Sequence, residues 1–216
     1  HLRRQCLRLY RLLAHSDFLH DPPLTEQLRL HHIDLSALCR DSVQAALQNG
    51  PARGTKNITV TVPDQCDALV EPQLVRTALY NLLSNALRVT PMAGDITVTL
   101  HDDHTFFTIS VADRGPGLHA ETFQALLTGW QRSVSLEDYL ALARQGAPLG
   151  LGLPLVHRIA QLHGGSLLLS PREGGGSILH LSLARLPESL ADHNLRAPMI
   201  LEDGYSLEEI EFSIFE

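Results

Sequence analysis

The sequence has few cysteines, no excess of basic residues and no long apolar run. Its three cysteines, Cys6, Cys39 and Cys66, are widely spaced and form no Cys-x-x-Cys pair. This pattern argues against a disulfide framework or a zinc knuckle, and it favours a reducing compartment. No stretch approaches the ~20 apolar residues of a membrane helix, and no signal peptide opens the chain. We therefore expect a cytoplasmic protein without membrane contact of its own, whose parent could be anchored through a segment upstream.

The charge balance is acidic. The chain has 17 Lys and Arg against 24 Asp and Glu, a formal net charge of −7. A general nucleic-acid binder needs a basic surface that neutralises phosphates, so we expect no nucleic-acid partner. A single bound nucleotide is compatible with this charge, because backbone amides and a metal ion can hold its phosphates. With 216 residues, of which 44% are hydrophobic, the chain is long enough for one full core.

Residues 1–23 are predicted to form a helix that two prolines end at positions 22 and 23. Apolar residues recur on one stripe of this helix at spacings of four, three and four: Leu2, Cys6, Leu9 and Leu13. Such a narrow stripe is typical of a helix that pairs with another helix, as in a dimer. It is also compatible with a helix packed on its own domain, and both interpretations stay open.

Residues 24–186 alternate between strand and helix patterns. The expected strands cover 57–63, two segments within 95–113, 166–170 and 177–184, and the expected helices cover about 36–49, 72–90 and 153–163. Ser36 is the expected N-cap of the first of these helices. Helices mixed with strands that are joined by hairpin-length turns indicate the α+β class, with a two-layer α/β sandwich whose helices cover one face of the sheet.

Residues 187–216 form an acidic C-terminal tail. Six acids fall between Glu202 and Glu216. Ile210, Phe212 and Ile214 alternate with polar residues, which predicts a possible edge strand.

Two asparagines and an arginine share one face of the predicted helix 72–90. Asn81, Asn85 and Arg88 are spaced i, i+4 and i+7. Carboxamides offer neutral oxygens to a hydrated Mg²⁺, and a guanidinium binds phosphate. Asparagines on a helix also commonly cap or face solvent, so this face alone does not identify a site.

A glycine-containing turn follows the second strand of the segment 95–113. Asp113 leaves the sheet where the chain turns through Gly115 and Gly117. Glycines allow positive φ and let a ligand approach the backbone. A carboxylate at this point can accept a hydrogen bond from an exocyclic amine such as that of adenine. An ordinary surface turn has the same sequence features.

Glycines also lead directly into the predicted helix 153–163. Gly150, Leu151 and Gly152 precede its first turn, where exposed N–H groups form a site for phosphates. A Rossmann fingerprint is excluded because its third glycine position holds Leu155, and a P-loop is excluded because no Gly-Lys-Ser/Thr follows.

Three segments, in this order, resemble the conserved boxes of sensor histidine kinases. NLLSNALRVTP (81–91) is similar to the N box, DRGPGL (113–118) to the first glycine box and GLGLPLV (150–156) to the second. The resemblance covers roughly residues 24–186 and implies the Bergerat fold of the GHKL ATPase superfamily. It also implies that 119–149 is a mobile lid and that 1–23 corresponds to the second helix of a dimerisation hairpin.

The resemblance further implies a nucleotide site for ATP and Mg²⁺. Asn85 would ligate the Mg²⁺ with help from Asn81, and Arg88 would lie near the phosphates. Asp113 would bind the adenine amine, with support from Ser177. The glycines of both boxes and Leu151 would line the nucleotide.

The implied function is that of the ATP-binding catalytic domain of a two-component sensor histidine kinase, which transfers the γ-phosphate of ATP to a histidine. No stretch resembles the surroundings of a phospho-accepting histidine, so no catalytic residue is identified and the acceptor is expected outside this chain. The expected partners are the receiver domain of a response regulator and a second copy of the parent protein, paired through the N-terminal helix.

Alternative functions stay open at this stage. Related ATP hydrolases carry a glutamate base at the position of Asn81, and a carboxamide cannot take that proton, so phosphoryl transfer is favoured over hydrolysis. A degenerate scaffold or phosphotransfer module remains an alternative because Pro148 stands in the second glycine box and the acceptor is missing. An anti-sigma-factor-type serine kinase is a further relative, although such kinases usually lack the preceding hairpin helix.

Overall fold

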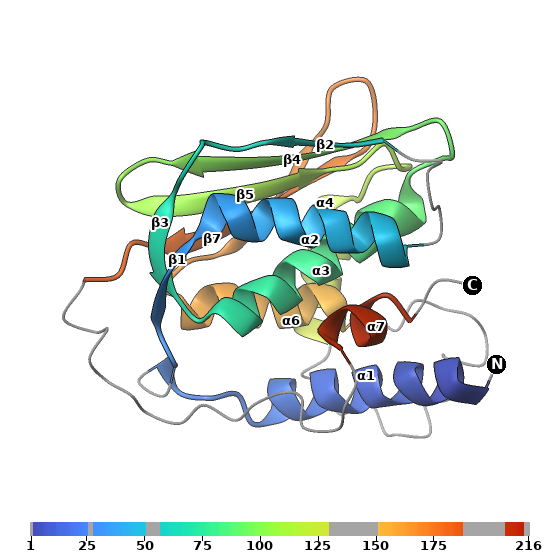
Figure 1. Cartoon of the computed structure of the whole chain (residues 1–216). Helices are drawn as coiled ribbons and strands as arrows, with labels where there is room; N and C mark the ends of the chain where they lie inside the picture. The colour runs from blue at the N-terminus through green and yellow to red at the C-terminus, as the bar shows by residue number, and fades with distance from the viewer. Residues whose placement is uncertain (1, 26–27, 51–56, 130–150, 188–205, 214–216) are drawn as a thin grey trace.

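A computed structural model describes residues 2–25, 28–50, 57–129, 151–187 and 206–213 (Figure 1). The elements in chain order are α1 (Leu2–His20), β1 (His31–Asp34), α2 (Leu35–Asn49), β2 (Asn57–Thr61), β3 (Asp67–Val70), α3 (Pro72–Val89), β4 (Asp95–Asp102), β5 (Phe106–Ala112), α4 (Ala120–Gly129), α6 (Gly152–Leu162), β6 (Leu167–Pro171), β7 (Ser177–Ala184) and α7 (Leu207–Glu211). Each strand and helix predicted between residues 36 and 184 therefore has a counterpart, with ends shifted by a few residues.

The main sheet has five strands in the order β2-β4-β5-β7-β6. β2 is parallel to β4, and the other neighbours are antiparallel. Buried residues alternate with less buried ones along most of β4 and all of β7, as expected for a sheet with one covered face. The short strands β1 and β3, which the sequence patterns did not predict, form a separate two-stranded sheet.

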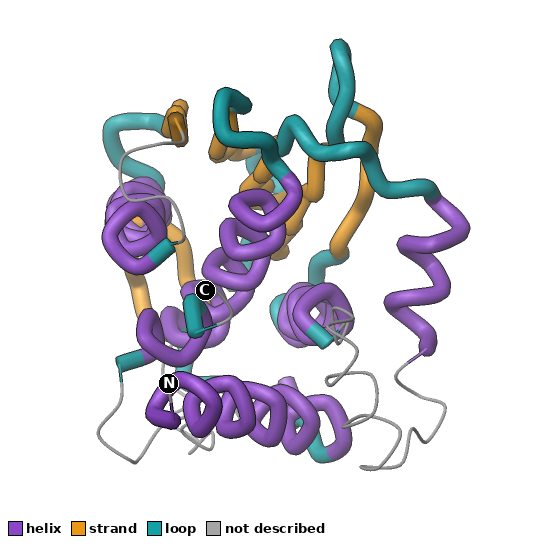
Figure 2. Tube along the Cα trace, turned by 90° about the vertical axis from the view of Figure 1, so that its right-hand side faces the viewer, coloured by secondary structure: helices purple, strands orange, loops and turns teal. Residues whose placement is uncertain are grey.

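Helices α2, α3 and α6 cover the buried face of the main sheet, and α1 lies beyond them (Figures 1 and 2). α3 packs against both α2 and α6. The predicted α+β sandwich is confirmed, with α1 as a further helix against its helical layer.

Side-chain caps set where two of these helices begin. The Glu71 carboxylate accepts hydrogen bonds from the backbone N–H groups of Gln73 and Leu74, and Pro72 occupies the first helical position of α3, where its missing N–H costs nothing. The predicted cap of α2 was wrong by two residues. Asp34 is the N-cap, and its carboxylate accepts from the N–H of Ser36.

α1 packs on its own domain through a face that the apolar stripe did not predict. Among the side chains of α1 that the structure describes, the buried ones are Leu7, His15, Phe18 and Leu19. Of the predicted stripe, Cys6 is exposed, and Leu9 and Leu13 are 45% and 47% exposed; the side chain of Leu2 lies outside the described part of the structure.

The predicted edge strand in the tail was wrong. The segment forms the short helix α7, because the Ser206 hydroxyl and the Glu209 carboxylate make reciprocal capping bonds with each other's backbone N–H groups. Ile210 and Phe212 are both buried by this helix, whereas Ile214 lies outside the described residues.

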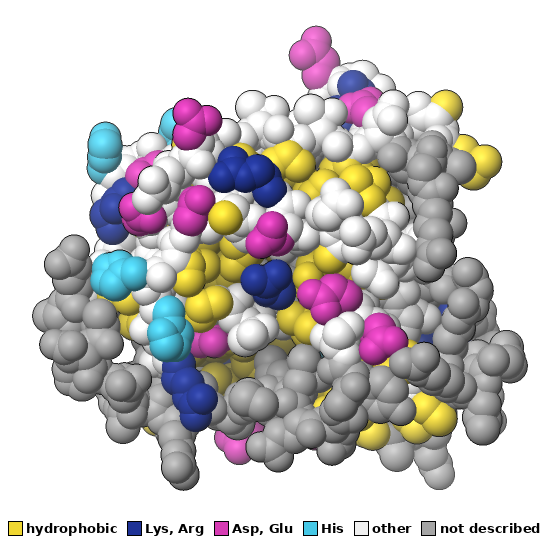
Figure 3. Space-filling model, in the orientation of Figure 1, with side chains coloured by type: hydrophobic (Ala, Val, Ile, Leu, Met, Phe, Trp, Pro, Cys, Tyr) yellow, Lys and Arg dark blue, Asp and Glu magenta, His cyan; other side chains and the backbone are white. Residues whose placement is uncertain are grey.

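Acidic and basic side chains are interspersed on the face of the molecule drawn in Figure 3. Among the described residues, no helix is long and apolar enough to cross a membrane.

Candidate nucleotide site

Helix α3 carries the three polar residues predicted to face a nucleotide. Asn81 is almost completely buried, at 1% exposure, Asn85 is half-buried and Arg88 is exposed. The Arg88 guanidinium donates to the Asn85 Oδ1 at 3.4 Å. Partial desolvation and, to a smaller extent, the positive charge of Arg11 lower the pKa of Arg88. Cationic and amide groups therefore gather along this face of the helix.

The start of α6 lies directly against this face. A Cβ built on Gly152 would lie 2.8 Å from the Asn81 Oδ1 and 3.8 Å from the Asn85 Nδ2. A glycine at this position lets the two helices approach closely. Leu151, the N-cap of α6, makes no side-chain capping bond, and the first N–H groups of a helix are suited to bind an anion. Gly150 lies outside the described residues.

Asp113 follows β5 and is held in place by backbone donors. Its Oδ1 accepts from the N–H of Gly115 at 2.7 Å and from the N–H of Ser177 at 3.4 Å. Among the described residues, no donor reaches its second oxygen, so Oδ2 remains for an external partner. The side chain is 7% exposed, and a partner bound there would be largely shielded from water.

Ser177 supports Asp113 through its backbone. Its carbonyl accepts from the Asp113 N–H at 2.9 Å, and its N–H donates to the carboxylate. The Ser177 hydroxyl accepts from the N–H of Leu118 at 2.7 Å. The hydroxyl therefore ties the end of the first glycine box to β7.

The glycines of the first box adopt the conformations for which glycine is needed. Gly117 has a φ of +84°, a region that side-chain-bearing residues rarely adopt. A Cβ on Gly115 would lie 2.7 Å from the Val89 Cγ2, so this turn packs on the C-terminal end of α3. The first glycine box and the N box are thus parts of one packed unit.

A charged cluster that sequence reasoning missed braces the same turn. Asp95, on β4, accepts hydrogen bonds from both Arg114 and Arg172. Arg114 also donates to the carbonyl of Glu173 at 2.7 Å. Hydrogen bonds from Arg172 and Arg114 lower the pKa of Asp95. The cluster links the first glycine box to the loop before β7.

Two further residues, which the sequence patterns did not predict as part of the site, contact Asn81. The Arg11 guanidinium donates to the Asn81 Oδ1 at 2.7 Å, and the Asn81 Nδ2 donates to the Glu211 Oε2 at 3.0 Å. Glu211 also pairs with Arg11 at 2.7 Å and with His15 at 2.8 Å. Burial raises the pKa of this carboxyl, but the charges and hydrogen bonds of His15 and Arg11 outweigh burial and lower the pKa of Glu211 to about 2.

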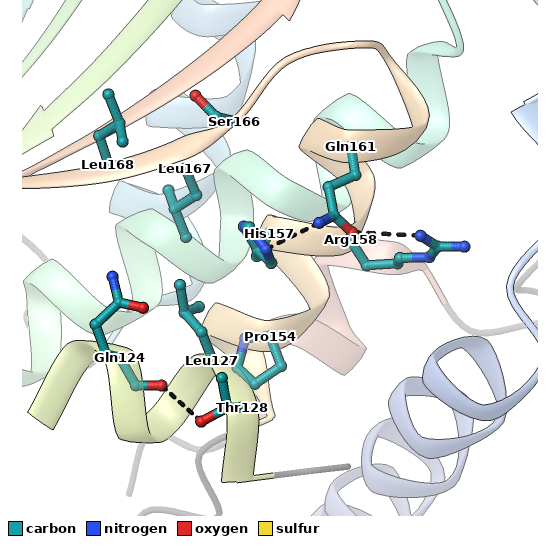
Figure 4. Close-up of a pocket in the computed structure, with 10 residues that line it drawn as sticks. All are labelled: Gln124, Leu127, Thr128, Pro154, His157, Arg158, Gln161, Ser166, Leu167 and Leu168. Atoms are coloured by element: carbon teal, nitrogen blue, oxygen red, sulfur yellow. Dashed lines mark hydrogen bonds between the residues drawn. The ribbon is translucent and has the colours of Figure 1, made fainter.

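A separate pocket of about 310 Å³ lies between α4, α6 and β6. Figure 4 shows Gln124 and Thr128 on one side, His157 and Gln161 on the other, and Leu168 at the strand. None of the described residues that are predicted to bind nucleotide lines this pocket, so it is distinct from the candidate site.

Residues 70–187 match the family of histidine kinase-, DNA gyrase B- and HSP90-like ATPases. The chain belongs to this family. The match spans the N box, both glycine boxes and the strands that close the sheet, so the chain carries an ATP-binding domain of the histidine kinase-like ATPase family.

Its curated relatives include sensor kinases. The chain is 32% identical over 156 residues to histidine protein kinase DivJ of Caulobacter vibrioides. This alignment covers 70% of this chain and 25% of that protein. It is 31% identical over 157 residues to sensor histidine kinase ZraS of Escherichia coli K12, and this alignment covers 72% of this chain and 31% of that protein. The chain therefore spans about a quarter to a third of the length of these relatives.

Solved histidine kinase structures share the fold. Full-length ShkA in complex with AMPPNP aligns over 85% of this chain and 37% of its own, with a TM-score of 0.63 and 23% identity. The cytoplasmic segment of histidine kinase QseC aligns over 83% of this chain and 94% of its own, with a TM-score of 0.57 and 23% identity.

Proposed function

We propose that this domain is the catalytic part of a two-component sensor histidine kinase, which binds Mg-ATP and directs the γ-phosphate to a histidine supplied by another segment. The observation that carries the proposal is the direct packing of Gly152 against Asn81 and Asn85. This contact places the Asn81 Oδ1 and the Asn85 carboxamide beside the start of α6, and amide oxygens and a helix start are groups that hold a metal-bound triphosphate.

The donor set fits a magnesium ion that keeps several water ligands. Asn85, half-buried beside the start of α6, would provide the protein oxygen, and Asn81 would assist from one turn before. Mg²⁺ is commonly held by one or two protein oxygens together with phosphates. When bound, it would neutralise charge on the phosphates. Arg88 would place a second positive charge on the same side.

The residues near Asn81 also favour transfer over hydrolysis. Asn81 cannot take a proton from water. The carboxylate next to it, Glu211, has a pKa of about 2, which makes it a weak proton acceptor near neutral pH. We therefore expect slow ATP hydrolysis, and phosphoryl transfer only when a histidine is presented in line with the γ-phosphate.

Asn85→Ala is expected to weaken Mg-dependent ATP binding by about tenfold or more, because a charge-assisted contact worth roughly 1.5–3 kcal/mol is lost. Calorimetric titration with ATP, with and without Mg²⁺, measures the effect. Asn49→Ala, an exposed asparagine at the end of α2, is the matched control and should bind like the wild type. Equal Mg-ATP affinity in the wild type and Asn85→Ala would remove Asn85 as the metal ligand.

We also propose that the exposed stripe on α1 is a dimer seam in the parent protein and that the phosphoryl group passes on to a response regulator. Leu9→Glu with Leu13→Glu should shift the parent protein from dimer to monomer, because charges would stand in an apolar helix–helix contact. Light scattering measures the mass. Leu168→Glu, at a side chain on β6 that is 57% exposed, is the control. A parent protein that is monomeric before any substitution contradicts the seam.

A further inference from the structure

The C-terminal segment 206–213 packs between α1 and α3. Tyr80, on α3, donates its hydroxyl hydrogen to the Glu208 carboxylate at 2.6 Å, and its ring meets that of Phe212 edge to face at 5.3 Å. On the other side, the Arg8 side chain donates to the carbonyl of Ser213 at 2.8 Å. Figure 1 shows α7 lying between α1 and the helical layer. The segment therefore connects α1 to the helix that carries the N box.

The centre of this connection is a buried carboxylate. Glu211 is 2% exposed and binds Arg11 and His15 of α1 through its two oxygens. A buried charge is stable only when it is paired and hydrogen-bonded. Glu211 therefore fixes where the Arg11 guanidinium lies, and it does so from a position 200 residues away in sequence.

The position of Arg11 affects Asn81 directly. Every polar atom of the Asn81 carboxamide is engaged: Oδ1 accepts from Arg11, and Nδ2 donates to the Thr77 carbonyl and to Glu211. A metal ion that approached Asn81 Oδ1 would meet the guanidinium at the same oxygen. Two cations that share one buried oxygen repel each other strongly. The docked position of α1 and the use of Asn81 by a metal–nucleotide complex therefore exclude each other.

We infer that segment 206–213 is an autoinhibitory latch, which holds α1 and its Arg11 over Asn81 and so competes with Mg-ATP. Because the coupling is reciprocal, Mg-ATP should loosen α1 by the same factor by which the docked α1 weakens Mg-ATP binding. The latch controls when α1 is free to move relative to the nucleotide. The inference rests on the proposed function, since it needs a nucleotide at the N box.

Glu211→Gln and Arg11→Gln test the latch in the full chain. Both variants should bind Mg-AMPPNP at least about fivefold more tightly than the wild type, the lower end of ordinary coupling between sites. Tyr80→Phe loses the hydroxyl that bonds to Glu208 and to Arg76 but leaves Arg11 and Glu211 unchanged. It should give a smaller gain, which provides a milder variant if the others unfold. Asp17→Asn, like Glu211→Gln, removes one negative charge, but from an exposed position on α1. It is the control and should leave the affinity for Mg-AMPPNP unchanged.

Hydrogen exchange of the α1 amides gives a second readout. Exchange over residues 2–20 should speed up in Glu211→Gln without nucleotide, and in the wild type when Mg-AMPPNP is added. If the wild type binds Mg-AMPPNP and both latch variants bind it equally well or more weakly, the latch is overturned and the proposed function stands. Weaker binding by the variants would make Arg11 a phosphate ligand. Failure of the wild type and all variants to bind nucleotide overturns the proposed function, and the latch with it.

Discussion

Asp113→Ala is expected to weaken ATP binding by roughly 1–3 kcal/mol, about 5- to 150-fold, and to abolish the preference for ATP over GTP. The carboxylate is 7% exposed, and its Oδ1 is occupied by the backbone N–H groups of Gly115 and Ser177. The protein itself therefore fixes the orientation of the carboxylate, and among the described residues no donor reaches Oδ2, which would be the oxygen that accepts from a base. An adenine amine donates to such an oxygen, whereas the guanine carbonyl at the same ring position would meet it acceptor to acceptor.

Asp113→Asn provides the sharper comparison. The carboxamide keeps the size of the side chain, but it can turn its N–H₂ toward the base. We expect ATP to bind more weakly and GTP to gain relative to ATP, because the amide donates to the guanine carbonyl. Competition titrations with both nucleotides measure the ratio of affinities, and thermal melting of each variant shows that the turn still folds. The same ATP-to-GTP ratio in the wild type and both variants would mean that Asp113 does not contact the base.

Regular patterns made most of the sandwich predictable. The strands β4, β5 and β7 alternate buried and half-buried residues over six to eight positions. Helix α3 combines an apolar face with a proline at its first position. β1 and β3 have four residues each, which is too short for an alternation to stand out. They are stabilised by pairing with each other across more than thirty positions of the chain. A pattern of neighbouring residues cannot indicate a pair so far apart in the sequence.

In the tail, an alternating pattern of apolar and polar residues led to the wrong type of element. Alternation of Ile210, Phe212 and Ile214 favoured a strand, yet Ser206 and Glu209 form the spacing of a capping box. The short helix turns Ile210 and Phe212 inward together with Glu211. A capping pair followed by buried residues was the better predictor, because the helix start is satisfied by side chains that lie only three positions apart.

The arrangement of the candidate nucleotide site could be predicted in part, but its side-chain contacts could not. The spacing of Asn81 and Asn85 placed both on one helical face, and the structure sets Gly152 against that face. Nothing in the sequence indicated that Arg11 and Glu211 would engage Asn81, since these pairs are separated by 70 and 130 positions. Contacts of this kind depend on how α1 and the tail pack on the finished sandwich.

The loop before β7 controls the position of Asp113 from the other side. Gly175 and Gly176 have nearly the same positive φ, +103° and +105°. Their surroundings differ. A Cβ on Gly176 would lie 2.0 Å from the carbonyl oxygen of Asp113, whereas a Cβ on Gly175 would meet nothing within 4 Å. Substitutions at the two positions therefore distinguish the effect of backbone strain from the effect of a steric clash with Asp113.

Gly176→Ala is expected to lower the free energy of unfolding by roughly 2–5 kcal/mol, the sum of about 1–2 kcal/mol for positive φ and about 1–3 kcal/mol for overpacking. Gly175→Ala should cost only the strain, about 1–2 kcal/mol. Urea denaturation measures both. The pair should also differ in ATP affinity, because the clash at position 176 displaces Asp113 from the Ser177 backbone, while the change at 175 does not reach it. Equal destabilisation and equal ATP binding in the two variants would show that the loop yields without moving Asp113, and that the carboxylate is positioned by β5 alone.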